Sequence, residues 1–262
     1  MNGNAYEGLA RYYDGLTTDV DYAAWLDWYQ SWFRESRVPV NLVLDLACGT
    51  GTLTCMLAER GYTMIGADLS PEMLAEALEK AQEVEGELPI FLNQAMDELD
   101  LFGTIDACVS SLDSMNYITD RETLAEAFRR VHTFLMPGGY FLFDIIAPQG
   151  LKALDDQLFV DETEDVFCLW RADFDQDSRV LTYGMDLFEL EGDLWRREQE
   201  EHYERAWEVS ELKGLLQAAG FAQVQVFGGL ERREPTLEDR RLCFVCVNGE
   251  GGQTAGQCAM SN

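Results

Sequence analysis

The chain has 262 residues, of which 47% are hydrophobic and 26% are charged, so it can bury a sizeable core and is not globally disordered. Its formal net charge of −29, from 48 acidic residues against 19 Lys and Arg, disfavours DNA or RNA as a partner. No apolar run approaches the roughly eighteen residues of a membrane span, and residues 1–13 show no signal sequence, so we expect a cytoplasmic protein without a membrane partner.

Aromatic residues at helical spacing mark the first segment of the chain. Tyr22, Trp25, Trp28 and their neighbours predict one or two amphipathic helices before Pro39. We expect residues 1–37 to form a helical cap that precedes the main fold.

Apolar segments then alternate with helical ones. Strands are predicted at 41–47, 63–69, 89–95, 105–112 and 140–146, and helices at 52–60, 72–84 and 121–134. The turn Pro137-Gly138-Gly139 is expected to precede the fifth strand. This alternation predicts a parallel, doubly wound α/β sheet with right-handed crossovers.

A change to period-two alternation follows, with strands expected at 166–174, 180–190 and 194–206. A helix over 207–219 and two closing strands, at 222–228 and 242–247, return to the first pattern. The main domain is therefore expected to comprise residues 38–150 and 206–247, with an antiparallel insertion at 155–205. Residues 248–262, rich in Gly, Gln and Ser, are expected to be a disordered tail.

The inserted segment leaves the sheet after Asp144, at the carboxyl edge where open α/β sheets bind ligands. We expect residues 155–205 to form a lid over that site and to exclude water from it. A dimer interface is the alternative explanation of the same pattern, so both a monomer and a homodimer stay open.

The motif VLDLACGTG carries the strongest signal for ligand binding. Gly49 and Gly51 follow a strand and allow close approach of the backbone to a ligand, while the next helix presents free N–H groups. Asp45 would repel a pyrophosphate, and Thr54 stands where a dinucleotide motif has its third glycine. Asp68 ends the second strand, where it can accept hydrogen bonds from a ribose diol. The pattern indicates an adenosine ligand with a positive tail and no pyrophosphate.

The segment LDLACGTGTLT, together with ADLSPEML at 67–74, resembles motifs one and two of class I S-adenosylmethionine-dependent methyltransferases. The resemblance covers roughly residues 5–247 and extends to YYDGL, SSLDSMNYITD, FLMPGGYFLFD and EEHYERAW. This set of motifs is similar to that of a bacterial subgroup of small-molecule methyltransferases whose N-terminal helix carries a Tyr-Asp pair. The resemblance implies a Rossmann-like seven-stranded sheet whose last strand is antiparallel. It also implies S-adenosylmethionine as cofactor and S-adenosylhomocysteine as product.

The same resemblance implies a set of cofactor-binding residues. These are Asp45, Ala47, Gly49, Gly51, Asp68, Leu69, Met73, Ala95, Met96, Leu112, Asp113 and Ser114. It places Asp68 on the ribose hydroxyls and Leu69 and Met73 against adenine. Relatives commonly carry an Asp at the position of Ala95, so the adenine amino group is expected to contact Asp97 or backbone carbonyls instead.

Candidate catalytic residues on the acceptor side are Tyr13, Tyr117 and His202, with Asp113 as a further substrate contact and Arg205 as an anion anchor. Two plainer explanations stay open. Tyr12, Tyr13 and Asp14 can serve only to pack the first helix. The charged residues from 196 to 205 are more often a solvated strand face, and His132 is expected to be structural.

Cys243 and Cys246 form a CxxC within the apolar run LCFVCV. A structural metal site of this type needs further Cys or His ligands, and the sequence offers no second pair. We therefore expect buried free thiols and no metal.

Methyl transfer from a sulfonium is an in-line displacement that needs alignment and water exclusion more than an acid–base triad. The chain lacks the Asn-Pro-Pro-Tyr, Asp-Pro-Pro-Tyr and Pro-Cys signatures of nucleic-acid methyltransferases. Methyl transfer to an oxygen or nitrogen of a small molecule is the favoured function. The alternatives are a non-catalytic module that binds an adenosine cofactor and an NAD(P)-dependent oxidoreductase, which Thr54 disfavours.

Overall fold

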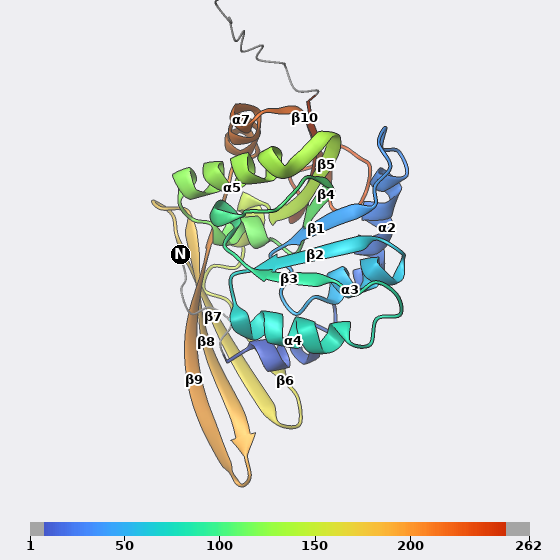
Figure 1. Ribbon diagram of the computed structural model, residues 1–262. Coiled ribbons are helices and arrows are strands. Elements are labelled where there is room, and N and C mark those ends of the chain that lie inside the picture. The colour runs from blue at the N-terminus through green and yellow to red at the C-terminus, as the bar shows by residue number, and fades with distance from the viewer. Residues whose placement is uncertain (1–7, 250–262) are drawn as a thin grey trace, which may run out of the picture.

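The computed structural model describes residues 8–249 and contains a seven-stranded sheet, covered by helices, beside a separate four-stranded sheet (Figure 1). Residues 250–262, most of the predicted disordered tail, lie outside the described part of the chain. Within that part, no helix is long and apolar enough to cross a membrane.

The seven-stranded sheet has the order β10-β11-β5-β4-β1-β2-β3. Its strands are β1 (Leu42–Leu46), β2 (Thr63–Asp68), β3 (Ile90–Asn93), β4 (Ile105–Ser110), β5 (Leu135–Ile146), β10 (Phe221–Gly228) and β11 (Arg241–Asn248). Strands β1 to β5 run parallel, whereas β11 is antiparallel to both of its neighbours. The predicted Rossmann-like sheet with an antiparallel last strand is therefore confirmed.

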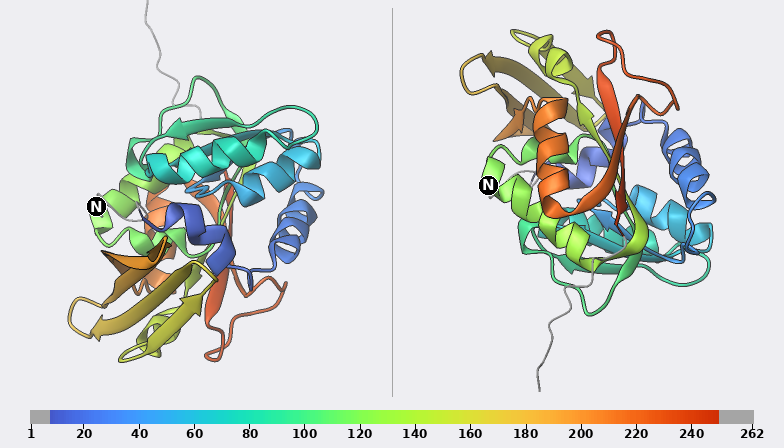
Figure 2. Two further views of the ribbon diagram at one scale, coloured as in Figure 1. Left: turned by 90° about the horizontal axis from the view of Figure 1, so that it is seen from below. Right: turned by 90° about the horizontal axis from the view of Figure 1, so that it is seen from above.

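Helices cover both faces of this sheet, and the right panel of Figure 2 shows α2 and α7 on opposite sides. One face carries α2 (Tyr22–Phe33), α3 (Thr52–Glu59) and α4 (Pro71–Ala81), and the other carries α5 (Arg121–Phe134) and α7 (Val209–Ala219). Successive strand residues point to opposite faces, so Leu44 and Leu46 pack under α5 and α7 while Val43 packs under α2 and α3. Each side of the sheet therefore has its own apolar core.

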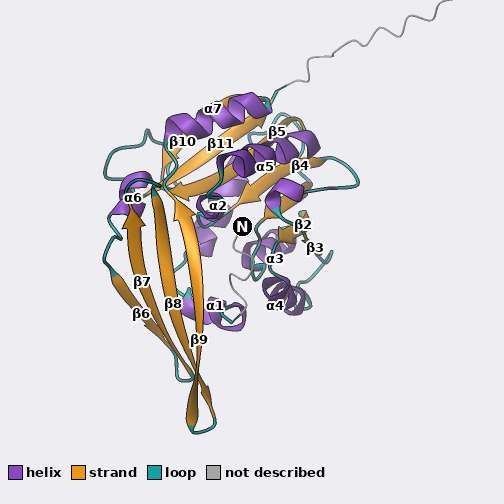
Figure 3. Cartoon of the chain, turned by 90° about the vertical axis from the view of Figure 1, so that its left-hand side faces the viewer, coloured by secondary structure: helices purple, strands orange, loops and turns teal. Residues whose placement is uncertain are grey.

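The N-terminal segment has two parts, of which only the second packs in the core of the main sheet. Helix α2 belongs to the main core, where Trp28 and Trp32 pack against Phe227 with ring centroids 5.7 and 5.4 Å apart. The short helices η1 (Ala10–Tyr12) and α1 (Tyr13–Leu16) instead lie away from the sheet. In Figure 3, α1 lies between the four-stranded sheet and α4.

Strand β5 begins five residues earlier than the sequence suggests, because α5 passes directly into it at Leu135. The Pro137-Gly138-Gly139 segment is an irregularity within the strand, and the pairing register with β4 shifts there. Gly138 has φ +83°, and a Cβ on Gly139 would lie 2.6 Å from the Asp106 carbonyl oxygen. Only glycine tolerates both conditions, so the predicted turn is a kink inside a strand.

The insertion forms an antiparallel sheet in the order β6-β7-β8-β9. After helix α6 (Pro148–Lys152) come β6 (Leu158–Glu162), β7 (Val166–Asp175), β8 (Val180–Glu191) and β9 (Leu194–Arg205). The sequence predicts the last three strands and misses β6, which is an almost wholly exposed edge strand without an alternating burial pattern. Figures 1 and 3 show the turn between β8 and β9 projecting away from the main domain.

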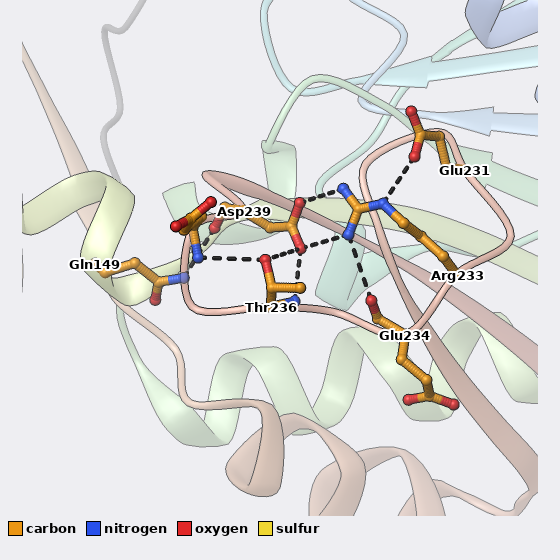
Figure 4. A network of polar contacts seen from close by, with 7 residues as sticks. Gln149, Glu231, Arg233, Glu234, Thr236 and Asp239 are labelled. Atoms are coloured by element: carbon orange, nitrogen blue, oxygen red, sulfur yellow. Dashed lines mark hydrogen bonds and ion pairs between the residues drawn. The ribbon is translucent and has the colours of Figure 1, made fainter.

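A polar network organises the connection between β10 and β11 (Figure 4). Arg233 forms an ion pair with Asp239 and donates 2.7 Å to Glu231. The Thr236 backbone N–H also donates to Asp239, at 2.6 Å. Gln149 Nε2 on α6 reaches the Asp239 carbonyl at 2.8 Å, so the connection is tied to the helix that leads into the insertion.

Candidate active site

A cavity of about 410 Å³ opens at the carboxyl ends of β1, β2 and β4, where a doubly wound sheet binds its ligands. Its walls come from the loops after β1 to β4 and from α1 and the start of α2. The volume is within the ordinary range for small-molecule sites, roughly 300–1,000 Å³.

Most predicted cofactor residues line this cavity. They are Asp45, Ala47, Gly49, Asp68, Leu69, Met73, Ala95, Met96, Leu112 and Ser114. Asp97, the expected partner of an adenine amino group, lines it too. The cavity lining does not include Gly51 or Asp113.

The loop after β1 holds three residues in left-handed conformations. Ala47, Gly49 and Gly51 have φ values of 59°, 54° and 72°. A Cβ at Gly51 would lie 2.8 Å from the Cβ of Ala77, so this glycine allows the loop to approach α4 closely. Gly51 thus shapes the site from behind, while the strained Ala47 is the kind of backbone feature that concentrates at functional sites.

Asp68 joins two loops at the mouth of the cavity. Its Oδ2 accepts a hydrogen bond from the Gly49 N–H at 2.8 Å, and its Oδ1 accepts one from the Ser70 N–H at 2.9 Å. Burial raises the pKa of Asp68, and these backbone donors oppose the rise. Leu69 is a third backbone donor to this carboxylate. A carboxylate can accept about four hydrogen bonds, so Asp68 keeps capacity for a sugar hydroxyl.

Asp45 is almost fully buried at the end of β1 and still lines the cavity. Its Oδ2 accepts a hydrogen bond of 2.6 Å from Thr54 Oγ1. Burial raises the pKa of Asp45 to about 6, against the lowering effect of that hydrogen bond. Thr54, which stands where a dinucleotide motif has its third glycine, therefore serves as the hydrogen-bond donor to this carboxyl group.

The loop after β4 is held by residues of the neighbouring strands β5 and β11. Leu112 and Asp113 have φ values of 57° and 56°. The Asp113 N–H donates 3.0 Å to Asp144 Oδ2, and Arg241 forms ion pairs with both carboxylates. Because the Asp113 side chain is committed to Arg241, Asp113 acts on the cavity through the loop it anchors.

Tyr13 reaches the cavity from α1. Burial raises its pKa, with Tyr22 and nearby carboxylates adding to the rise, so the hydroxyl stays protonated at neutral pH. The neighbouring Asp14 accepts 2.6 Å from Thr50 Oγ1 and pairs with Lys80 Nζ at 2.5 Å. Of the Tyr-Asp pair noted in the sequence, Tyr13 therefore lines the cavity, and Asp14 docks α1 onto the loop after β1 and onto α4.

The remaining candidates lie at different depths. Tyr117, on the helix η3 (Ser114–Tyr117), lines the cavity. His202 does not, because its ring lies behind Tyr117 at 6.2 Å between centroids, and its Nε2 is 3.1 Å from Glu200 Oε2. Arg205 does not line the cavity either, since it donates to the Thr119 carbonyl at 2.8 Å and covers the Trp207 ring.

Sequence reasoning missed several lining residues. They include Tyr22, Cys48, Thr50, Thr52, Ser70, Glu72, Gln94, Ser111, Asp120 and Thr123. Cys48 and Thr50 could have been named because they alternate with the motif glycines. Tyr22 and Asp120 give no such signal, since only the fold brings α2 and the start of α5 to the site.

The cavity wall has a pronounced charge bias. Its ionisable carboxyl groups are Asp45, Asp68, Glu72, Asp97 and Asp120, and none of the described lining residues is Lys, Arg or His. Such a wall attracts a cation and repels phosphate. A sulfonium cofactor fits it, whereas a dinucleotide pyrophosphate does not.

The two cysteines of the CxxC motif face opposite sides of β11. Cys246 belongs to the core under α5 and α7, and Cys243 to the core under α2 and α3. Both are buried and free, and their placement prevents them from ligating one ion together. His132, which the sequence suggests is structural, packs on Phe221 with ring centroids 5.4 Å apart.

The parallel sheet, the left-handed glycine turn and the acid at the end of β2 define a Rossmann-like enzyme that binds a nucleoside cofactor. A methyltransferase-domain family matches residues 43–139. YqeM of Bacillus subtilis (strain 168), named as a methyltransferase, is 34% identical over 242 residues, which cover 91% of this chain and 95% of YqeM.

Solved structures agree with this class. An S-adenosylmethionine-dependent methyltransferase from Clostridium acetobutylicum ATCC 824 has 30% identity and a TM-score of 0.83, covering 94% of this chain and 100% of its own. The sugar N-methyltransferase KedS8 from Streptoalloteichus sp ATCC 53650 shares the fold, with a TM-score of 0.75, 24% identity and coverage of 95% and 94%. This chain belongs to the S-adenosylmethionine-dependent methyltransferases.

Proposed function

We propose that this enzyme methylates an oxygen or a nitrogen of a small-molecule acceptor. The observation that carries the proposal is the cavity at the carboxyl edge of the sheet, which Gly49, Asp68, Tyr13 and Tyr117 all line. When bound, S-adenosylmethionine supplies a methyl group on a sulfonium for in-line displacement. The enzyme's own share is to orient both partners and to exclude water.

The cofactor-binding residues are proposed from their places in the wall. Asp68 accepts hydrogen bonds from the ribose hydroxyls, Leu69 and Met73 contact adenine, and Ala95 and Met96 frame its edge. The Gly49 turn and the stretch Leu112 to Ser114 border the methionine part. All of these residues except Asp113 line one continuous cavity, which supports the assignment.

The acceptor is proposed to be neutral or cationic. The wall carries carboxylates and, among its described residues, no cationic side chain, so an acceptor bearing phosphate or carboxylate would be bound against repulsion. A basic amine has the complementary charge. The sugar N-methyltransferase KedS8 shows only that this fold admits nitrogen methylation.

The lid is proposed to act through the N-terminal segment. No residue from 155 to 205 lines the cavity. Instead, Val166, Met185 and their neighbours on β7 and β8 pack against Leu9 and Tyr13. The insertion thus backs α1, which covers the cavity and excludes water from it. A dimer interface on the exposed strands is the alternative role, and a nucleic-acid partner is not proposed.

A metabolite extract separated by charge tests the proposal. Small molecules from cells that make this protein are split into fractions retained on a cation exchanger, retained on an anion exchanger, or retained on neither. Each fraction is incubated with enzyme and S-adenosylmethionine, and release of S-adenosylhomocysteine is measured. We expect release with the cationic or the neutral fraction.

The control variants are Asp68→Ala, expected to release less S-adenosylhomocysteine at a limiting cofactor concentration because its cofactor affinity is lower, and the exposed Glu79→Ala, expected to match wild type. If no fraction supports release although the cofactor binds, the chain is a binding module and the proposed activity is wrong. Release with the anionic fraction alone would refute the proposed charge of the acceptor.

A further inference from the structure

Strand β9 turns ionisable side chains toward the main domain. Glu200, His202 and Glu204 alternate along the strand and share one face; His202 is 0% and Glu204 2% exposed. Their neighbours Glu201 and Tyr203 pair with each other on the other face, at 2.5 Å. The charged segment, expected to be a solvated strand face, is therefore solvated except at its C-terminal end, where His202 and Glu204 are buried. Burying acidic side chains costs free energy, so the presence of buried ionisable residues on this face calls for a functional explanation.

Glu204 lies one side chain away from the cavity. Its carboxyl group is hydrogen-bonded to the side chain of Tyr117, which lines the cavity. The other oxygen, Oε2, is buried and has no hydrogen-bond partner among the described residues. The Asn116 amide donates 3.0 Å to the Arg205 carbonyl, which fixes β9 against η3 at this point. The carboxyl is thus held against the back of Tyr117.

The charges around Glu204 leave it poorly compensated. Asp113 faces it from the loop after β4 and Arg241 from β11, and Arg241 already pairs with Asp113 and Asp144. Tyr183 faces it from β8, and His202 shares its strand face. Burial raises the pKa of Glu204 well above its ordinary value, Asp113 adds to the rise, and Arg241 and Tyr117 oppose it. One guanidinium serves three carboxyl groups, so Glu204 has a high affinity for a proton.

We infer that Glu204 accepts, through the hydroxyl of Tyr117, the proton that the acceptor loses when it is methylated. The inference rests on the proposed function, because an amine or a hydroxyl sheds a proton on methylation. Glu204 does not touch the cavity, so it is a positioning residue that acts through Tyr117. A carboxylate whose pKa is raised binds a proton more strongly than an ordinary one, so it is the stronger base once it is ionised.

An amine reacts in its unprotonated form. The nitrogen lone pair forms the bond to the methyl carbon, and the electron pair of the broken C–S bond stays on sulfur, which becomes a thioether. The N–H proton passes to the Tyr117 oxygen while the Tyr117 hydroxyl proton passes to the Glu204 carboxylate. No oxidant, reductant or further reactant is needed.

The test measures S-adenosylhomocysteine release between pH 5.5 and 9, using the active metabolite fraction as acceptor. Four proteins are compared: wild type, Glu204→Gln, Tyr117→Phe and the matched control Glu201→Gln on the exposed face of β9. Calorimetry with S-adenosylhomocysteine and a melting curve accompany each variant. The wild-type rate should rise with pH as Glu204 loses its own proton.

We expect Glu204→Gln and Tyr117→Phe to lower the rate about 100-fold or more, the scale of general-base catalysis, and to lose this rise. Their cofactor affinity should stay within about threefold of wild type, and Glu201→Gln should be unchanged. A wild-type rate and pH profile in Glu204→Gln would overturn the inference. So would a fall in rate matched by an equal loss of cofactor affinity, which is the mark of a structural role.

If Glu204→Gln does not fold, Tyr117→Phe, which leaves the buried carboxyl in place, decides the question by the same pH profile. An unchanged profile in Tyr117→Phe then overturns the inference. A wild-type protein that releases no product with any fraction contradicts the proposed function itself. An active wild type with indifferent variants contradicts only the role of Glu204.

Discussion

At the scale of single residues, Asp68 connects the architecture of the site to its proposed chemistry. It binds the backbone of Gly49 and of Ser70, so one carboxylate sets the spacing of the loops after β1 and β2. The acceptor capacity that remains on the carboxylate is what the proposed ribose contact would use. A residue of this kind contributes to binding both directly and by holding the loops in place.

Replacing Asp68 with Ala should weaken S-adenosylhomocysteine binding by about 1.5–3 kcal/mol, the scale of lost hydrogen bonds to a charged group. The fold should survive, because Asp68 lies at a strand end. Isothermal calorimetry measures the affinity, and Glu79→Ala on the exposed face of α4 is the control. Unchanged affinity in Asp68→Ala would show that another residue anchors the ribose.

Asp45 makes stability depend on pH. Its pKa of about 6 in the folded protein lies above the ordinary value of 3.8. Between roughly pH 4 and 6 the folded state keeps a proton that the unfolded state has released, so the unfolding free energy falls as pH rises through this window. The full loss is on the order of 3 kcal/mol.

Asp45→Asn is uncharged at every pH and keeps an oxygen for Thr54. Relative to wild type it should therefore gain stability on going from pH 4 to pH 7, by up to about 3 kcal/mol. Urea unfolding at the two pH values measures the gain, with the exposed Glu79→Gln as control. An equal stability difference at both pH values would contradict the buried titration.

Sequence predicts residues well where a motif and a strand end coincide, and poorly elsewhere. Asp68, Gly49 and Met73 occupy the cavity wall because local pattern places them there. The positions of His202 and Arg205 depend on how β9 docks, and nothing in the local pattern separates the buried face of that strand from the solvated one. The buried Glu204 carries the same sequence signal as its exposed neighbours.

At the scale of elements, the short helix α1 is the link between the two sheets. Leu9 and Tyr13 pack on an apolar patch of β7 and β8, and Asp14 reaches Thr50 on the motif loop. A helix of four residues has little stability of its own, so these contacts must hold it in place. The position of α1 therefore depends both on the insertion and on the loop after β1.

Met185→Ala removes a fully buried side chain of β8 from that patch and should cost about 2 kcal/mol or more. Because the patch lies outside the main core, we expect residues 9–16 to lose protection from hydrogen exchange and cofactor affinity to fall, while β1 and β4 stay protected. The exposed Leu237→Ala is the control. Unchanged exchange in residues 9–16 would mean that the insertion does not support α1.

Helices and strands were predicted correctly where the hydrophobic period of a segment and its length indicate the same type of element. The parallel strands and their helices are confirmed, as is the antiparallel character of the insertion. Edge strand β6 was missed because its residues are mostly exposed and do not alternate. The early start of β5 was missed because Pro-Gly-Gly ordinarily marks a turn, and only the register with β4 shows that the strand absorbs it.

At the scale of the whole molecule, the acidic composition continues into the cavity. The net charge of −29 repels polyanions, and the cavity wall adds carboxylates without a cationic side chain among the described residues. Long-range and local fields thus act in the same direction, and both favour a cationic cofactor, as they would the neutral or basic acceptor that we propose. The four-stranded sheet packs against the N-terminal segment that lines this site.

We propose that the cavity at the carboxyl edge of the sheet holds the cofactor with its sulfur toward Tyr13 and Tyr117. The crystal structure of the complex with S-adenosylhomocysteine tests it most directly. The ribose hydroxyls should lie within hydrogen-bond distance of Asp68, adenine against Leu69 and Met73, and the sulfur on the side of Tyr13 and Tyr117. A ligand bound elsewhere, or one bound with its ribose away from Asp68, would contradict this binding mode.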